Sequence, residues 1–351
     1  MSTPLSVALI GCGRISSRHV EVVKVLPSLR LVGVCDAVRA RADAVAARAG
    51  VPASYDHVEM LRALRPDIVT VATESGNHAQ VVIDAAPFTK HVIVEKPMAL
   101  TLDSADRMIE ACEHAGVGLH VVQQNRYNRP VVMLRRALQA GRFGKMVLGT
   151  VRVRWCRTQE YYNQDAWRGT WKDDGGVFTN QASHHVDLLQ WMMGPVESVQ
   201  AYCATRLVDI ETEDTGVAIF KFVSGALGIV EATTATRPKD LEGSLSILGE
   251  KGSVVIGGFA VNRIETWNFT EPGPGDELIP ESSTNPPTVY GFGHHEFYKD
   301  VVDCITTARR PMLDGMEGRK SLELITALYE AAFSGREVRL RYVPSNVPLG
   351  R

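Results

Sequence analysis

The sequence contains few cysteines and no Cys-x-x-Cys pair. Its six cysteines are scattered along the chain, at positions 12, 35, 112, 156, 203 and 304. This distribution is typical of reduced thiols in a cytoplasm, whereas a disulfide framework or a zinc site needs cysteines at short, regular spacings. We therefore expect a cytoplasmic protein with no disulfide and no structural metal.

Long apolar runs and an excess of charge of one sign are also missing. No segment reaches the ~20 apolar residues that a membrane span needs, and residues 1–9 lack the basic, apolar and small-residue order of a secretory signal. The formal net charge is −2, so nothing draws the whole chain to nucleic acid or to an anionic membrane. An anionic ligand needs a local site.

What is present fits a globular protein of two domains. The chain has 351 residues, of which 45% are hydrophobic and 22% are charged. This length is sufficient for two separate cores.

A glycine-rich turn follows the first predicted strand. Residues 5–10 form an apolar run, and Gly11, Gly13 and Ser16 stand where a helix predicted over residues 14–25 begins. This strand–turn–helix order is the context that a dinucleotide fingerprint requires, because the first glycine permits the turn and the second lets a pyrophosphate approach the helix N-terminus. Ser16 replaces the usual third glycine.

An acidic residue follows the second predicted strand, residues 31–35. Asp36 is placed to accept hydrogen bonds from the adenosine ribose hydroxyls, and its charge would repel a 2′-phosphate. The pattern therefore favours NAD over NADP, although Arg39 and Arg41 follow closely. The alternative is that Asp36 caps the helix predicted over residues 38–49.

The same alternation continues to residue 123. Further strands and helices are predicted in turn over residues 68–72, 78–86, 91–94, 101–115 and 118–123. Strands separated by helices at this spacing form parallel β-α-β units. We therefore predict that residues 1–123 form a doubly wound α/β domain of the Rossmann type.

Two loops leave the carboxyl edge of this sheet, where ligands bind. The first, from Thr73 to His78, is predicted to pass along the cofactor, unless its polar residues only cap the next helix. The second begins with Glu95, Lys96 and Pro97. Desolvation and a positively charged cofactor ring disfavour the ammonium form of Lys96, which makes this lysine a candidate proton acceptor. The alternative is a solvated turn.

Beyond residue 123 the pattern changes to period-two alternation, which indicates strands with one buried face. These strands are predicted over residues 146–156, 196–205, 215–222, 227–234, 241–248 and 253–256. Consecutive strands imply an α+β domain over residues 124–351 with a large, open, mostly antiparallel sheet. Its uncovered face is a candidate oligomer surface. Residues 270–293 are predicted to be a functional or disordered loop.

A helix over residues 181–193 carries polar side chains on one face. Asn180, His184 and Asp187 share this face, and the opposite face is predicted to contact the core through Val186, Leu189 and Met193. We therefore expect His184 to point away from the core, into solvent or a cleft. The alternatives are a helix cap for Asn180 and an ordinary surface histidine for His184. No set of ligands at zinc spacing surrounds it.

These marks together resemble the Gfo/Idh/MocA oxidoreductase family. The resemblance rests on Gly11-x-Gly13, Glu95-Lys96-Pro97 and the run Gly175-Gly176 through Asn180-x-x-x-His184-x-x-Asp187. It implies oxidation of a sugar or polyol hydroxyl by a nicotinamide cofactor, with Lys96 and His184 as the catalytic pair. Many members have Asp where this chain has Asn180. A neutral amide does not raise a histidine pKa as a carboxylate does, so the division of roles within the pair stays open.

Longer stretches look like one group within this family, the UDP-N-acetyl-2-amino-2-deoxyglucuronate 3-dehydrogenases of bacterial O-antigen (lipopolysaccharide) biosynthesis. They are residues 124–128, 161–162, 167–171, 180–184, 194–201, 241–252 and 289–294. The likeness implies NAD-dependent oxidation of the C3 hydroxyl of a UDP-sugar, UDP-N-acetylglucosaminuronic acid, to a 3-keto product that a PLP-dependent aminotransferase then consumes. It also implies a homo-oligomer, a dimer or tetramer.

The same resemblance implies a set of binding residues. For the cofactor these are Gly11, Gly13, Arg14, Ile15, Asp36, Thr73, His78, Glu95, Lys96, Gln124, Trp167 and Arg168. For the substrate they are Lys96, Arg126, Arg157, Tyr162, Arg168, Asn180 and His184. A diphosphate and a sugar carboxylate need fork-shaped cations on an otherwise neutral protein, which suits the three arginines. Each arginine can instead belong to a surface ion pair.

Three other activities fit the same scaffold. An NAD-dependent glycoside hydrolase would release free sugar without net NADH, and a regulator would bind the cofactor and turn over nothing. A dehydrogenase of inositol or a simple sugar would ignore UDP-sugars. The sequence leaves open whether NADH leaves the enzyme or is reoxidised in place.

Overall fold

The chain divides into two compact units. The computed structural model describes residues 3–258, 260–279, 293–341 and 347–350. The first unit comprises Met1–Gln123 and His294–Leu322, and the second comprises Gln124–Gly293 and Glu323–Arg351. The division predicted from the sequence is a single one at residue 123, without the return of residues 294–322 to the first unit.

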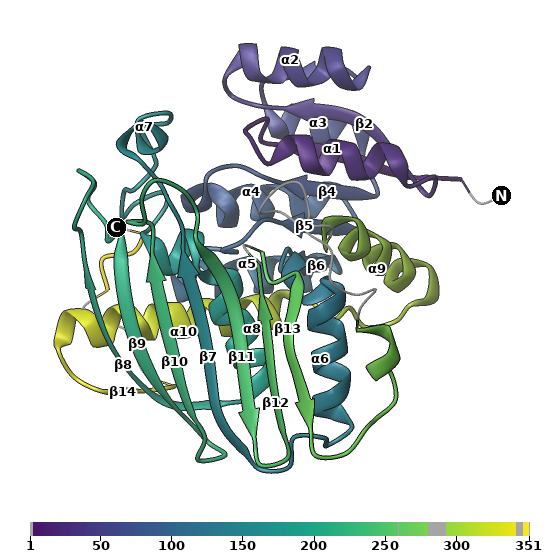
Figure 1. The fold of residues 1–351 in the computed structure, drawn as a ribbon. Helices are drawn as coiled ribbons and strands as arrows, with labels where there is room; N and C mark the ends of the chain where they lie inside the picture. The colour runs from purple at the N-terminus through teal and green to yellow at the C-terminus, as the bar shows by residue number, and fades with distance from the viewer. Residues whose placement is uncertain (1–2, 259, 280–292, 342–346, 351) are drawn as a thin grey trace. The chain divides into compact units, whose positions relative to one another are not determined.

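The first unit is built on a six-stranded parallel sheet in the order β3-β2-β1-β4-β5-β6 (Figure 1). Its strands are β1 (Leu5–Ile10), β2 (Leu29–Cys35), β3 (Ala53–Ser54), β4 (Ile68–Val71), β5 (His91–Val94) and β6 (Gly118–Val121). Its helices are α1 (Ser16–Val25), α2 (Arg39–Ala49), α3 (His57–Leu64), α4 (His78–Ala85), α5 (Leu102–Ala115) and α9 (Gly293–Thr307). This confirms the predicted doubly wound α/β fold and adds β3 and α3, which the sequence pattern did not indicate.

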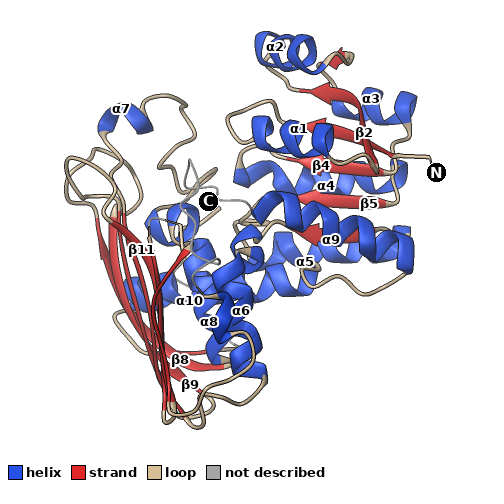
Figure 2. Cartoon of the chain, turned by 45° about the vertical axis from the view of Figure 1, so that its right-hand side comes forward, coloured by secondary structure: helices blue, strands red, loops and turns tan. Residues whose placement is uncertain are grey.

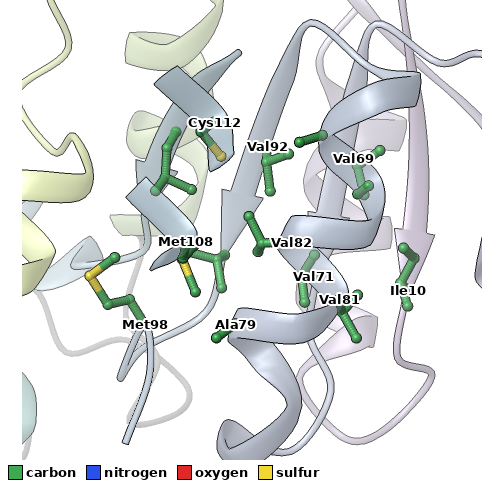
Figure 3. Close-up of a cluster of buried hydrophobic side chains, with 14 of the residues drawn as sticks. Ile10, Val69, Val71, Ala79, Val81, Val82, Val92, Met98, Met108 and Cys112 are labelled. Carbon is green, nitrogen blue, oxygen red and sulfur yellow. The ribbon is translucent and has the colours of Figure 1, made fainter. Parts of the chain in front are cut away.

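Apolar strands and capped helices explain this architecture. Strand β4 is buried at every position, as strands covered by helices on both faces must be. Helix α5 begins after Thr101, whose hydroxyl oxygen accepts a hydrogen bond from the Ser104 N–H at 3.1 Å. Figure 3 shows the cluster that results, with side chains from α4 and α5 packed against β4 and β5.

The second unit is built on an eight-stranded sheet in the order β13-β12-β11-β7-β10-β9-β8-β14. Its strands are β7 (Met146–Arg154), β8 (Val196–Ala204), β9 (Thr215–Phe222), β10 (Leu227–Thr233), β11 (Glu242–Gly249), β12 (Gly252–Gly257), β13 (Arg263–Phe269) and β14 (Val338–Arg339). All neighbours are antiparallel except β7 and β10, which are parallel. The predicted open, mostly antiparallel sheet is therefore confirmed.

Helices cover one face of this second sheet. The helices of the unit are α6 (Arg129–Gln139), α7 (Gln159–Tyr162) and α8 (Ser183–Met193), and α10 (Gly315–Ser334) runs from the first unit into the second. Figure 2 shows α6 and α8 on the same side of the strands. On the opposite face the side chains of Val217, Ile219, Leu227 and Ile229 are exposed.

Two further predictions concern segments that the structure describes in part or not at all. Of the loop predicted over residues 270–293, residues 280–292 lie outside the described residues, as does most of the stretch 289–294. Within the described residues, no helix is both long and apolar enough to cross a membrane.

Candidate active site

The turn after β1 needs its first glycine and leaves room at its second. Gly11 has a φ of +98°, and a Cβ there would lie 2.4 Å from the backbone carbon of Ala72, so no other residue fits. A Cβ at Gly13 would meet no protein atom within 4 Å. Ser16, the departure from the usual pattern, donates its hydroxyl to the Gly13 carbonyl at 2.5 Å. The turn is therefore closed by a serine hydroxyl and open beside Gly13.

Asp36, at the end of β2, is held by backbone donors. One carboxylate oxygen accepts the Cys12 N–H at 2.8 Å, and the other accepts the Val38 N–H at 2.7 Å. Helix α2 starts after Val38 and has no side-chain cap, so Asp36 does not cap it. The half-buried carboxylate is thus fixed beside the glycine turn with capacity for further hydrogen bonds. Next to the turn, Arg14 is exposed and Ile15 half-buried.

The loop after β4 contains a buried histidine that joins two backbone segments. Nδ1 of His78 lies 2.8 Å from the Pro97 carbonyl oxygen, and Nε2 lies 3.0 Å from that of Thr73. Burial lowers the pKa of His78, against hydrogen bonds to both carbonyls. His78 therefore links the loop after β4 to the loop after β5, with a carbonyl oxygen beside each ring nitrogen, although a neutral ring donates to only one of them. The Thr73 side chain is half-buried.

Lys96 stands just after β5, as predicted. Its side chain is half-buried, and its backbone N–H donates to the Glu95 carboxylate at 3.2 Å. The peptide bond between Lys96 and Pro97 is cis. Glu95 itself is buried. The lysine therefore leaves the sheet from a backbone that a buried carboxylate holds.

In the second unit, His184 lies on a helix that is buried almost all round. Every residue of α8 except Gln190 and Trp191 is buried. His184, which was predicted to point into solvent or a cleft, is only 7% exposed and therefore does not lie in open solvent, and Asp187 on the same face of the helix is 1% exposed. Nε2 of His184 lies 3.0 Å from the side-chain amide nitrogen of Gln124.

Asp187 faces an arginine that was expected at the substrate. Arg126 donates to both carboxylate oxygens of Asp187, at 2.8 Å and 2.7 Å, and both side chains are buried. The guanidinium also lies 4.9 Å from the Trp191 ring centroid. In this structure Arg126 thus anchors α8 to the turn at Gln124–Tyr127.

The other two arginines lie nearer the surface of the second unit, beside aromatic rings. Arg157 pairs with Asp240 at 2.9 Å. Arg168 donates to Asp165 at 3.1 Å and to the hydroxyl of Tyr161 at 2.8 Å. Its guanidinium lies 4.7 Å from the Tyr161 ring centroid and 4.5 Å from that of half-buried Trp167. Stacking of this kind leaves the edge of a planar guanidinium able to form a fork with an oxyanion.

Tyr162 and Asn180 both have partners within the unit. The Tyr162 side chain is buried, and its hydroxyl lies 3.1 Å from that of Thr234. Burial raises the pKa of Tyr162 to about 12. Asn180 donates to the Asp174 carboxylate and accepts from the Gln181 amide at 2.9 Å. The nearby Tyr161, which joins Arg168 to Gln181 through its hydroxyl, was not predicted, because no periodic pattern connects the three.

A π-helical turn, Val177–Gln181, carries Asn180 and precedes α8. Glu213 stabilises this turn. One of its carboxylate oxygens accepts hydrogen bonds from the Phe178 N–H at 3.0 Å and from the Tyr329 hydroxyl at 2.8 Å. Burial raises the pKa of Glu213 to about 7. The segment that carries Asn180 therefore rests on a carboxyl group that is half protonated near neutrality.

Comparisons with known proteins agree for both halves of the chain. Residues 5–123 match the NAD-binding Rossmann fold of the GFO/IDH/MocA oxidoreductase family model, and residues 135–340 match its C-terminal alpha/beta domain. The WlbA dehydrogenase of Chromobacterium violaceum, in complex with NADH and UDP-GlcNAcA, is 45% identical, with a TM-score of 0.91 and 97% of each chain covered. The WlbA dehydrogenase of Bordetella pertussis, with the same two ligands, is 44% identical, with a TM-score of 0.94, and covers 98% of this chain and 99% of its own. Myo-inositol 2-dehydrogenase of Thermotoga maritima is 26% identical over 97% of this chain and 99% of its own.

Proposed function

This chain belongs to the Gfo/Idh/MocA oxidoreductase family, and we propose that it oxidises the C3 hydroxyl of UDP-N-acetylglucosaminuronic acid to a 3-keto sugar with NAD. One observation carries the proposal. Two dehydrogenases that are 45% and 44% identical to the chain over almost its whole length have structures with NADH and UDP-GlcNAcA. The inositol and apiose dehydrogenases that it resembles are only 26% identical.

The glycine turn and Asp36 fit a dinucleotide. The space beside Gly13, where a Cβ meets no protein atom within 4 Å, admits a pyrophosphate at the start of α1. The oriented Asp36 carboxylate accepts ribose hydroxyls and disfavours a 2′-phosphate, which supports NAD. Arg14, Ile15, Thr73 and Gln124 remain proposed cofactor contacts, as do Glu95, Lys96, Trp167 and Arg168. His78 is proposed to support the cofactor loop through the backbone, because a carbonyl oxygen lies beside each of its ring nitrogens.

Lys96 is the proposed proton acceptor. Bound NAD supplies the acceptor for the hydride that leaves sugar C3. The side-chain amide of Gln124 lies 3.0 Å from Nε2 of His184, so this ring nitrogen already has a partner within the protein. His184 is therefore assigned to hydrogen bonding and orientation of the sugar, and Lys96 to removal of the hydroxyl proton.

Arg157 and Arg168 are the proposed anion-binding residues. Both lie against aromatic rings, and each already pairs with an aspartate; a guanidinium held in this way suits a diphosphate or a sugar carboxylate. Arg126 and Tyr162 are proposed to act on the substrate site indirectly, because their polar groups already form hydrogen bonds with Asp187 and Thr234. Asn180 is proposed to contact the sugar from the end of the π-helical turn.

The wider setting follows from the chemistry. NAD and nucleotide sugars are cytoplasmic metabolites, and the six cysteines form no disulfide, which supports a cytoplasmic enzyme. A 3-keto sugar is a substrate for a PLP-dependent aminotransferase, so we place the reaction before an amination in O-antigen biosynthesis. The exposed apolar face of the second sheet supports a dimer or tetramer.

The direct test is incubation of the purified protein with UDP-N-acetylglucosaminuronic acid and NAD. We expect a rise in the absorbance of reduced nicotinamide and loss of two hydrogens from the nucleotide sugar by mass spectrometry. Loss of the two hydrogens without net NADH would show that the cofactor is reoxidised in place. If neither signal appears and the protein instead oxidises free inositol or a simple sugar, the proposed substrate is wrong.

A further inference from the structure

Glu95 is the centre of a buried group of hydrogen bonds in the first unit. One carboxylate oxygen accepts from Nε2 of His19 at 3.0 Å and lies 3.4 Å from Nε2 of His294. The other accepts the backbone N–H of Lys96 at 3.2 Å. His19 comes from α1, the helix after the glycine turn, and His294 from α9. The carboxylate therefore connects α1, α9 and the end of β5 beside the backbone of Lys96.

The hydrogen bonds have one consistent direction when the His19 ring is neutral. A carboxylate only accepts, so the proton of His19 sits on Nε2 and its Nδ1 accepts. Nδ1 lies 2.9 Å from the hydroxyl of Tyr298, which lies 2.9 Å from that of Thr70. The hydroxyl of Thr70 donates to Tyr298, Tyr298 to His19, and His19 to Glu95. Each donor polarises the next, and the series ends on the negative charge.

This arrangement keeps Glu95 ionised. Burial alone would raise the pKa of Glu95, but the hydrogen bonds from His19 and His294 outweigh it and hold the pKa well below the usual range. The titratable groups that face the carboxylate or its partners are Arg18 and His19 from α1, His78 from α4, and His294 and Tyr298 from α9. Burial lowers the pKa of both His78 and His294. Glu95 is thus a buried negative charge that these hydrogen bonds hold in place.

We propose that Glu95 is a positioning residue for Lys96: its carboxylate fixes the lysine backbone at the end of β5 and stabilises the lysine ammonium, and His19 and Tyr298 hold that carboxylate in place. The inference rests on the proposed function only in taking Lys96 as catalytic. The carboxylate is 3.2 Å from the Lys96 nitrogen, and a lysine side chain reaches about 7 Å, so Nζ lies within about 10 Å of the charge. At that distance a partly buried charge shifts a pKa by about one unit.

A metal site is the alternative interpretation of this cluster, and the experiment must distinguish it from the positioning role. The ligand atoms of His19, Glu95 and His294 lie within 4.8 Å of one another, a spacing that also suits a metal ion. In a metal site the two Nε2 atoms would have to give up their protons. The hydrogen-bond directions above need no such loss, which favours the positioning role.

The experiment measures the titration of Lys96 without any sugar. Full-length protein and the variant Glu95→Gln are treated with cyanate over a range of pH, and carbamylation of Lys96 is followed by peptide mass spectrometry. We expect the midpoint for Lys96 to fall by about one pH unit in the variant, because the ammonium loses a nearby anion. Glu95→Asp, which keeps the charge, should restore the midpoint. Lys90, exposed at the other end of β5, is the internal control and should not move.

Three outcomes would overturn the proposal: an unchanged Lys96 midpoint in Glu95→Gln, an equal shift of Lys90, or one equivalent of metal in the purified wild-type protein by elemental analysis. Because carbamylation needs no substrate, the result is independent of the UDP-sugar assignment. If Glu95→Gln does not fold, Tyr298→Phe replaces it. Loss of that hydroxyl should loosen His19 and speed hydrogen exchange of the Lys96 amide about tenfold, and unchanged exchange would equally contradict the proposal.

Discussion

The side-chain amide of Gln124 lies within hydrogen-bonding distance of Nε2 of His184, at 3.0 Å. The sequence left the partner of this histidine open, because Asn180 stands where many family members have Asp, and in the structure the amide of Asn180 donates to Asp174. Gln124 is therefore a residue through which the protonation of His184 can be tested.

Replacement of Gln124 by Glu should raise the pKa of His184 by one unit or more, because a carboxylate stabilises the imidazolium beside it. The measurement is NMR titration of the His184 ring in labelled protein. Gln124→Met is the matched control, since it removes the hydrogen bond without adding charge and should shift the pKa less than Gln124→Glu does. Equal titration of the two variants would show that Gln124 does not act on His184.

Lys96→Met should lower kcat by about 10²–10⁴-fold, the range for loss of a positioned acid or base, and His184→Asn should lower kcat because the sugar is no longer oriented for hydride transfer. The Kd for NAD, measured by fluorescence, should change by less than about threefold, because the glycine turn and Asp36 are untouched. Lys90→Met is the control for loss of a positive charge from the same strand. Wild-type turnover in either active-site variant would remove that residue from the mechanism.

Asp187→Asn should lower the free energy of unfolding by about 3–5 kcal/mol, because it leaves the buried Arg126 guanidinium without its counter-charge. Urea denaturation measures the change. Lys221→Met, which removes the exposed partner of Glu197, should cost less than about 1 kcal/mol. If Arg126→Met raised the KM for the UDP-sugar and left stability intact, Arg126 would be a direct substrate ligand instead.

Stability should fall as the pH rises from about 4.5 to about 7 because of Glu213. Burial raises the pKa of this group from 4.5 to about 7, so over this range the folded protein keeps a proton that the unfolded chain has released. This contribution to the free energy of unfolding, about 3 kcal/mol in total, is fully present below pH 4.5 and is lost as the pH rises through 7. Urea midpoints against pH should show this slope in the wild type and a flatter curve in Glu213→Gln. Equal slopes in the wild type and in Glu213→Gln would show that another group causes the pH dependence.

Ile219→Lys should dissociate the proposed homo-oligomer, for which the open face of the second sheet is the candidate interface. Its side chain is 58% exposed on β9, beside the exposed Ile229 of β10, and a lysine there would bury a charge in the interface. Sedimentation velocity distinguishes the species. Arg30→Lys, on an exposed position of β2 in the other unit, is the control; an unchanged oligomer in Ile219→Lys would exclude this face.

The position of Lys96 was predictable because local signals define it. The apolar residues 92–94 indicate a buried strand, and the carboxyl end of such a strand lies at the ligand edge. Gly11 was predictable for a similar reason, since a tight turn between a strand and a helix requires a positive φ. Both features depend on only a few neighbouring residues.

Contacts between distant residues were not predictable. His19 and His294 reach Glu95 across 76 and 199 positions, and no sequence period marks such a meeting. The face of α8 that packs on the sheet was predicted, since Leu189 and Met193 lie against Gly149 of β7, but the burial of its polar face was not, because the period of a single helix does not show what covers it. In the structure the polar residues His184 and Asp187 are buried with Gln124 and Arg126 as partners, which single-helix periodicity does not reveal.

The contact of Glu95 with His294 also has a consequence for synthesis of the chain. At about 5–20 residues per second, the 199 positions between them take about 10–40 s to translate. Strands β7 to β13 are all made in that interval. The first unit thus emerges from the ribosome first and receives its last helix, with His294 and Tyr298, only after most of the second unit exists.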